Sequence, residues 1–249
     1  MSKTRFSPAQ EALMLRELIR DQFKYSLFSF ARRICGYDQV NAQTHGLIIK
    51  ALEHPHRKKL IVCPRGSFKS SVCIVAFSMW LLVRNPNLRI LISSELYTNS
   101  KNFIREIKGH IEGDAFRKHF GDWRGNTWHE SEIIVSARTK NLKEASITAG
   151  GVGTVKVGQH YDVILMDDVN SHKNSDTVDK ANKVLNYYKY LISILEPNGL
   201  LAVIGTRYAQ NDLIGHIIEN ECEIKDIDLE VPLHNKKVLL KQESKGLIL

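Results

Sequence analysis

The chain lacks long apolar runs, an apolar leader and any repeated or low-complexity segment. Across its 249 residues, no apolar stretch approaches the about 20 residues that a membrane-spanning helix needs. Residues 1–4 are polar and do not resemble the apolar core of a secretory signal. These absences predict a cytoplasmic protein without a membrane partner.

Cysteine is scarce, and its four positions show no spacing typical of a metal site or a redox pair. Two of the cysteines, Cys63 and Cys73, lie in apolar surroundings, so we expect small buried side chains there. The other two are Cys35 and Cys222. The sequence therefore predicts neither a disulfide framework nor a cysteine-bound metal.

Composition is that of an ordinary globular protein, with 43% hydrophobic and 25% charged residues. The length suits one large α/β domain or two small ones. A formal net charge of +8 favours a polyanionic partner such as nucleic acid. The basic residues are spread widely, and a generic solvated surface explains each cluster equally well.

The order of expected elements predicts an α/β fold with a helical start. Ser7, Pro8 and Gln10 form a capping-box pattern, and Asn41 can cap a second helix that runs to about residue 53. From residue 59, strands alternate with helices, which predicts a mostly parallel sheet flanked by helices. Strands are expected at 59–63, 88–93, 131–136, 144–149, 161–166, 200–205 and 223–231, and helices at 69–84, 96–111, 176–195 and 210–220. We expect 113–130 to be a loop.

The run CPRGSFKS at 63–70 lies between an apolar strand and an apolar helix. Backbone N–H groups at a helix N-terminus bind anions, and a lysine with a hydroxyl completes a phosphate site. Lys69 and Ser70 fit the end of the pattern G-x-x-x-x-G-K-[ST], but Cys63 and Phe68 replace its two glycines. Taken alone, a strand, turn and helix with a solvent-facing lysine explains the run equally well.

Two adjacent acids, Asp167 and Asp168, follow an apolar run that is typical of a strand buried on both faces. Because successive side chains on a strand point to opposite faces, we expect the two carboxylates to diverge. Asp167 is a candidate Mg²⁺ ligand, and Asp168 is a candidate to orient or activate a water near the γ-phosphate. The alternative is a strand that simply ends in solvent, but the run at 63–70 upstream, which contains Lys69, favours the functional interpretation.

A third strand is expected to end at Gly205, followed by Thr206 and Arg207. In a parallel sheet, ligands gather at the carboxyl ends of the strands, so Thr206 would lie beside the two acids. Its hydroxyl can hydrogen-bond the γ-phosphate or the attacking water. A polar residue that closes a strand is the alternative.

Further candidates flank these three strand ends. Gln43 can match the edge of an adenine through its amide, with His45 as a weaker candidate, although a solvated surface glutamine is equally common. Arg65 lies within the run and is a natural partner for a phosphate. A charge that stabilises the transition state, in cis or from a neighbouring subunit, can come from one of three residues: Arg138, Lys156 or Arg207.

In this order and spacing, the strand-end motifs resemble the ATPase domain of the phage terminase large subunit, the motor that packages double-stranded DNA into procapsids. The likeness covers about residues 43–215 and rests on three segments: 64–70, 164–168, and 204–208 with 211–213. It implies a P-loop NTPase of the ASCE type that uses ATP and Mg²⁺ in the host cytoplasm. It also implies double-stranded DNA, a portal protein and a small terminase subunit as partners of a homo-oligomeric ring.

The resemblance also implies residue roles. Asp168 would be the catalytic acid, Thr206 the residue that couples hydrolysis to DNA movement, and Gln43 the adenine contact. Arg138 and Lys69 complete the implied catalytic set. Ser70 and Asp167 would hold the metal. The nucleotide would also lie against the phosphate loop, at Arg65, Gly66, Ser67, Phe68, Lys69, Ser70 and Ser71.

The chain departs from the family pattern at three points. Asp168 stands where many such motors have glutamate, and Phe68 replaces a glycine whose freedom lets the loop follow the phosphates. Too few residues follow the last motif for the family's C-terminal nuclease, so we expect an N-terminal part of a longer protein without nuclease activity. The expected parts are a helical segment at 1–58, an ATPase core at 59–232 and a basic, aperiodic tail or linker at 233–249.

Two other functions remain open at this point. A helicase-like nucleic-acid ATPase would share the loop and the acids, but it would normally carry a second motor domain that this length does not provide. A non-catalytic DNA-binding or assembly module with a decayed nucleotide site would explain Cys63, Phe68 and Asp168.

Overall fold

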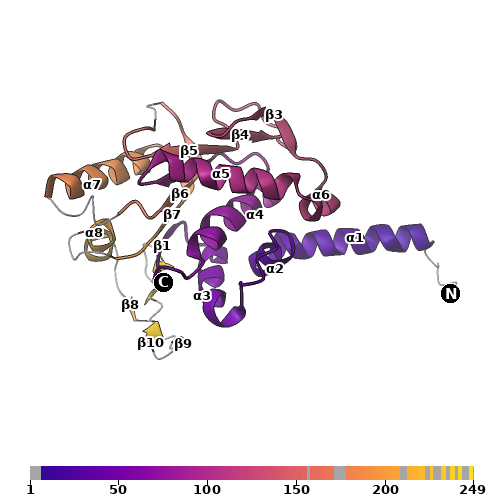
Figure 1. The fold of residues 1–249 in the computed structure, drawn as a ribbon, viewed down its shortest axis with the longest axis horizontal. Helices are drawn as coiled ribbons and strands as arrows, with labels where there is room; N and C mark the ends of the chain where they lie inside the picture. The colour runs from indigo at the N-terminus through magenta and orange to yellow at the C-terminus, as the bar shows by residue number, and fades with distance from the viewer. Residues whose placement is uncertain are drawn as a thin grey trace.

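The computed structural model describes residues 7–155, 158–170, 178–207 and 212–221, together with short strands at 225–226, 231–233, 236–238, 241–242 and 247–248. A mostly parallel sheet forms the centre and carries helices on its faces (Figure 1). Its strand order is β3-β4-β5-β2-β6-β7-β1-β12-β11-β8. The parallel centre consists of β5 (Ile147–Gly151), β2 (Ile90–Ser94), β6 (Tyr161–Asp167), β7 (Leu195–Gly205) and β1 (Lys58–Val62).

The sheet register brings the three predicted strand ends to one edge. Strand β7 lies between β1 and β6, with Gly205 opposite Val62 and Ile204 opposite Asp167. Because these strands are parallel, the segments that follow them all leave the sheet on the same side. The expected mostly parallel α/β architecture is therefore confirmed.

Each face of the sheet has its own apolar core because side chains alternate along buried strands. In β2, Ile90 and Ile92 join the larger core, whereas Leu91 joins the other. The larger core includes buried residues of η1 (Ser71–Ala76), α4 (Phe77–Arg84) and α5 (Tyr97–Glu112). The second core is formed with α7 (Val178–Ser193) and α8 (Leu213–Asn220).

The helical start confirms the capping prediction. The Ser7 hydroxyl accepts from the Gln10 backbone N–H at the start of α1 (Pro8–Tyr25). Buried residues of α2 (Leu27–Arg33) and α3 (Ala42–Glu53) belong to the larger core. Helix α1 projects from the body (Figure 1), with three exposed leucines: Leu13, Leu15 and Leu18. Among the helices that the structure describes, none is long and apolar enough to cross a membrane.

Two expected irregular segments contain regular structure. Between 113 and 130 lie α6 (Asp114–Phe120) and β3 (Arg124–Trp128), which pairs with β4 (Glu132–Val135). The loop prediction was wrong because buried Phe116 packs against Phe120 and Trp123, and Gly121 (φ 83°) ends the helix.

The tail predicted to be aperiodic also contributes short strands, among them one that pairs in parallel with β1. Within 233–249 these strands are β10 (Lys236–Val238), β11 (Lys241–Gln242) and β12 (Leu247–Ile248), whereas β8 (Lys225–Asp226) and the start of β9 (Val231–Leu233) lie where a strand was expected, at 223–231.

Candidate nucleotide-binding site

The loop at 63–70 connects β1 to a helix that includes η1 and α4. The loop has left-handed backbone at Gly66 (φ 77°) and Phe68 (φ 58°), which turns the chain before the helix starts. The helix continues through the π-helical turn Ser71–Ala76 into α4. Such turns are rare and often occur at functional sites. The predicted strand, loop and helix therefore exist here.

Lys69 is the point at which the three strand ends meet. Its side chain is buried, and its Nζ lies 3.2 Å from Asp168 Oδ2. Nζ also donates to Thr206 Oγ1 at 3.3 Å. The Thr206 hydroxyl in turn donates to the carbonyl of Cys63 at 3.0 Å. One buried ammonium thus links the phosphate loop, the acidic strand end and the strand between them.

Ser70 and Asp167 form a second contact beside the first. The Ser70 Oγ lies 2.9 Å and 3.0 Å from the two carboxylate oxygens of Asp167, and its proton can be given to either. Burial, together with the neighbouring charge of Asp168, raises the pKa of Asp167 to about 7, although Ser70 and Lys69 oppose this shift. A cation at this position would restore the ionised form.

The two acids do not diverge as expected. Asp168 follows the last residue of β6 and has φ 41°, which rotates its side chain toward Lys69 instead of the opposite face. Among the described residues, its other oxygen, Oδ1, is buried without a hydrogen-bond partner. A buried oxygen left unpaired in a native site calls for an explanation, and a bound water or ion would supply a partner.

The oxygen atoms at this edge fit a magnesium ion better than a softer metal. A hydroxyl and a carboxylate are ligands that Mg²⁺ accepts, and it usually keeps water and substrate phosphates as the rest of its shell. Within the described part of the chain, no group of three or more His, Cys, Asp or Glu could hold a metal by itself. The site therefore fits a metal that arrives with a phosphate ligand.

The start of α3 borders the phosphate loop. His45 is buried, and its Nδ1 accepts from the Asn41 backbone N–H at 3.2 Å, so Nε2 carries the proton and donates to the Ser67 carbonyl at 3.1 Å. Gln43 lies on the first turn of the same helix with an exposed side chain. Arg65 and Gly66 are also exposed. This neighbourhood is compatible with an adenine near Gln43, which stays a prediction.

Arg138 is not brought to this site within its own chain. Its Nη1 donates to the Glu144 carbonyl at 2.8 Å, close to Arg89 and Asp162 at the amino ends of β2 and β6. Its Nε and Nη2 are buried and have no hydrogen-bond partner within the part of the chain that the structure describes. Arg207 is exposed and directly follows Thr206. Lys156, the remaining candidate for the charge that stabilises the transition state, lies outside the described residues. Tyr208 and Asn211 of the third motif also lie outside them, as does Cys222.

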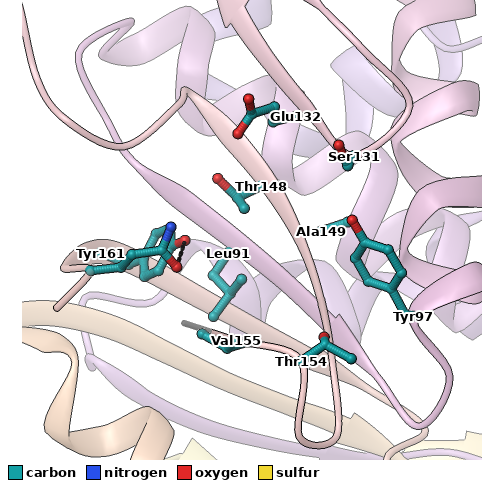
Figure 2. A pocket seen from close by; sticks show the side chains of 10 residues that line it. Leu91, Tyr97, Ser131, Glu132, Thr148, Ala149, Thr154, Val155 and Tyr161 are labelled. Atoms are coloured by element: carbon teal, nitrogen blue, oxygen red, sulfur yellow. Dashed lines mark hydrogen bonds between the residues drawn. The ribbon is translucent and has the colours of Figure 1, made fainter. Parts of the chain in front are cut away.

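A hollow at β5 has none of Lys69, Asp167 and Thr206 in its wall (Figure 2). Hydroxyl groups and the carboxylate of Glu132 dominate this wall, and among the described residues no lysine or arginine lines it. The lining residues are Leu91, Tyr97, Ser131, Glu132, Thr148, Ala149, Thr154, Val155, Gln159 and Tyr161.

Sequence reasoning missed Tyr37, which contacts Phe68 of the phosphate loop with ring centroids 5.0 Å apart. Nothing in the local pattern links these two positions, because the contact depends on how α2 and α3 pack beside the loop. The glycines at 150 and 151 end β5. A Cβ on Gly151 would lie 2.7 Å from the Tyr97 backbone nitrogen, so close packing against α5 explains that glycine.

No protein-family model and no curated protein matches the chain. Among solved structures, it is similar to the large terminase ATPase domain of Thermus phage P74-26, with a TM-score of 0.54 and 10% identity over 87% of this chain and 82% of that chain. It also matches Dbp5 of S. cerevisiae (TM-score 0.45, 15% identity, 73% of this chain) and a DEAD box protein of Methanococcus jannaschii (TM-score 0.41, 14% identity, 71% of this chain). The chain spans 46% of the length of each of these two. With its mostly parallel sheet and flanking helices, the chain has the fold of the P-loop NTPases.

Proposed function

We propose that the chain is an ATP hydrolase that translocates double-stranded DNA, as the ATPase part of a terminase-like packaging motor. The observation that carries this proposal is that Asp168 and Thr206 both contact the buried ammonium of Lys69, beside the Ser70–Asp167 pair. The similarity to a large terminase ATPase domain over most of both chains supports the terminase type.

In this proposal, the triphosphate replaces contacts that the site makes with itself. The Lys69 ammonium moves from Asp168 and Thr206 to phosphate oxygens, while backbone N–H groups at the start of the helix, from Lys69 on, bind the same anion. Arg65 adds a second cation, and Gln43 contacts the adenine. Ser70 and Asp167 hold the magnesium ion, which when bound neutralises charge on the phosphates.

Asp168 is positioned to act on the attacking water. Its unpartnered Oδ1 can accept a hydrogen bond from that water and align it with the γ-phosphorus. The water oxygen forms a bond to phosphorus as the bond to the ADP oxygen breaks, and Asp168 takes the water proton. Lys69 stabilises the charge that develops on the phosphoryl oxygens.

Thr206 and an arginine complete the proposed machinery. The Thr206 hydroxyl bridges Lys69 and the Cys63 carbonyl, so loss of the γ-phosphate changes its partners and can be transmitted along β7. Arg138, pinned at the other edge of its own sheet, can contribute only to the site of a neighbouring subunit. This fits a homo-oligomeric ring. The net charge of +8 supports DNA as the partner, with portal protein and small terminase subunit in the host cytoplasm as the proposed setting.

Phosphate release at high protein concentration with Mg²⁺ tests the proposal, with double-stranded DNA, single-stranded DNA and RNA compared as activators. Double-stranded DNA should stimulate release most. Asp168→Asn should retain ATP binding and lose about 10²-fold or more in release, as expected for a group that aligns the attacking water. Asp179→Asn, an exposed acid on α7, is the matched control and should hydrolyse like the parent.

Other outcomes identify the alternative functions. Stimulation by single strands but not by duplex would replace the packaging proposal with a helicase-like nucleic-acid ATPase. Absence of release under every condition, with intact DNA binding, would indicate a binding module whose nucleotide site has decayed.

A further inference from the structure

We propose that Phe68 is a positioning residue, and that Tyr37 and His45 hold its ring so that the phosphate loop keeps its nucleotide-binding shape without the usual glycine. We call these three residues the aromatic latch. The inference rests on the proposed function, because it concerns how the same site holds a triphosphate.

The backbone of Phe68 is in a conformation that a phenylalanine seldom adopts. Its φ is 58°, in the left-handed region, immediately before Lys69. For a residue with a Cβ this region is disfavoured relative to glycine by about tenfold or more in population. Strained residues of this kind persist only where the surroundings hold them, and they gather at ligand sites. The contacts that hold Phe68 are therefore part of how the loop works.

The ring of Phe68 is held by two aromatic neighbours. Tyr37 meets it edge to face, with centroids 5.0 Å apart and an interplanar angle of 88°. His45 lies 6.4 Å away at the same angle. Both distances are within the range of favourable edge-to-face pairs. Tyr37 and Phe68 also pack against the larger apolar core, so removal of the ring would expose this contact to water.

The side chain of His45 also forms a hydrogen bond to the backbone of the phosphate loop. Its Nε2–H donates to the carbonyl of Ser67, the residue before Phe68, at 3.1 Å. Its Nδ1 accepts from the Asn41 backbone N–H, which fixes the ring orientation at the start of α3. One imidazole thus restrains two successive residues of the phosphate loop.

Tyr37 connects the latch to α5. Its hydroxyl donates to Glu106 Oε1 at 2.5 Å and lies 3.1 Å from His110 Nε2. Burial and the Glu106 hydrogen bond raise the pKa of Tyr37, so the phenol keeps its proton as a donor. Helix α5 follows β2, whose last residue Ser94 is in register with Asp167. The latch therefore joins the loop to the element beside the acidic strand.

The first arm of the test measures binding of a fluorescent ATP analogue with Mg²⁺. Phe68→Ala loses the ring but keeps the backbone penalty, whereas Phe68→Gly loses both. We expect Phe68→Gly to bind about tenfold more tightly than Phe68→Ala. Tyr37→Ala should weaken binding about tenfold when residue 68 is phenylalanine, and the loss should disappear in the Phe68→Gly background. Phe103→Ala, a packed aromatic of α5 outside the latch, should bind like the parent.

A residue that only stabilises the fold would not produce this background dependence, since binding is measured on folded protein. Equal affinity of the Ala and Gly variants, or an equal Tyr37→Ala loss in both backgrounds, would overturn the latch. If the parent itself binds no better than Lys69→Ala, the proposed function fails instead.

The second arm needs no nucleotide and so separates the two failures. In urea unfolding of the ligand-free protein, Phe68→Gly should be more stable than Phe68→Ala by about threefold in the unfolding constant, because the entropic cost of glycine offsets part of the relieved backbone strain. The opposite order would show that Phe68 is unstrained, and the latch would be rejected whatever the nucleotide result.

Discussion

The amino and carboxyl ends of the parallel strands both carry acidic and basic side chains, but the two groups differ in how completely these side chains pair with one another. At the amino ends, Arg89 donates to Asp162 from three nitrogens, and its guanidinium also contacts Glu144 and Glu196. At the carboxyl ends, Lys69 faces Asp168, whose Oδ1 has no hydrogen-bond partner among the residues that the structure describes, and the neighbouring Asp167 has a raised pKa. The first cluster satisfies itself, whereas the second leaves atoms and charge to be completed by a ligand.

The carboxylate pKa values support this distinction between the two clusters, because they shift in opposite directions. Burial tends to raise the pKa of Asp162, but hydrogen bonds from Arg89 outweigh it and the net shift is downward. For Asp167, burial and the like charge of Asp168 win, and the shift is upward. Paired carboxylates of the first kind support a fold, and clustered ones of the second kind are typical of functional sites. Arg138 is an exception at the amino edge, since two of its nitrogens are buried and find no partner in the described ranges of the chain.

The largest expected effect comes from breaking the carboxyl edge. Lys69→Ala removes the ammonium that contacts both Asp168 and Thr206, and with it the proposed cation for the phosphates. We expect ATP hydrolysis to fall by about 10²- to 10³-fold, the usual loss of a preorganised charge partner, with little change in stability. Phosphate release and thermal unfolding measure the two quantities. Lys101→Ala, which removes a surface pair with Glu130, is the control. A Lys69→Ala variant that hydrolyses ATP normally would contradict the proposed difference between the carboxyl and amino edges of the sheet.

Breaking the amino edge should have the reverse profile. Arg89→Ala leaves the buried Glu144 and the half-buried Asp162 without their cation. Loss of one partner of a buried ion pair costs about 3 kcal/mol, which is a hundredfold change in the unfolding constant. Urea unfolding should show this loss, while the apparent KM for ATP stays near that of the parent. A selective loss of ATP binding without destabilisation would show that the two edges are not separate.

The pH dependence sharpens the contrast further. The folded-state pKa of Asp167, about 7, lies above its ordinary value of 3.8, so the unfolded chain releases this proton at lower pH. In the ligand-free protein, the stability that Asp167 contributes is complete below pH 4 and is lost as pH rises to about 7. Mg²⁺ needs the ionised carboxylate, so Mg·ATP affinity should fall up to tenfold per unit as pH drops below about 7. Asp167→Asn should remove the pH slope of stability, measured by urea unfolding across pH 4–8. An unchanged slope would assign it to another group.

Sequence patterns located the elements of the carboxyl edge better than their geometry. The strand that ends at Asp167 and the lysine at the start of a helix both follow from apolar periodicity and short motifs. The rotation of Asp168 was not predictable, because alternation along a strand no longer holds where the backbone leaves it with positive φ. The roles proposed for these residues stay predictions.

Long-range packing explains what the sequence could not show. The Tyr37–Phe68 contact joins residues far apart in the chain, and no local pattern encodes it. In the segment 113–130, glycines and tryptophans suggested a loop, yet Phe116 finds a buried place that stabilises a short helix. At the amino edge, Arg89 and Glu144 are ordinary charged residues in the sequence, and only the fold brings them together.

The smallest expected effect concerns the hydroxyl that links the two sides of the carboxyl edge. Thr206→Val keeps the shape of the side chain but removes both the acceptor for Lys69 and the donor to the Cys63 carbonyl. In our proposal the Lys69 ammonium lies on the phosphates when ATP is bound, so the variant then loses chiefly the neutral hydrogen bond to Cys63. Such a bond contributes about 1 kcal/mol, and we therefore expect about a fivefold loss of DNA-stimulated hydrolysis. Thr206→Ser keeps the hydroxyl and is the matched control. If Thr206 couples hydrolysis to DNA, the valine variant loses stimulation by duplex but keeps basal release close to that of the serine variant. An equal loss of basal and stimulated rates would instead assign Thr206 to holding Lys69 in place, and the coupling role would be wrong.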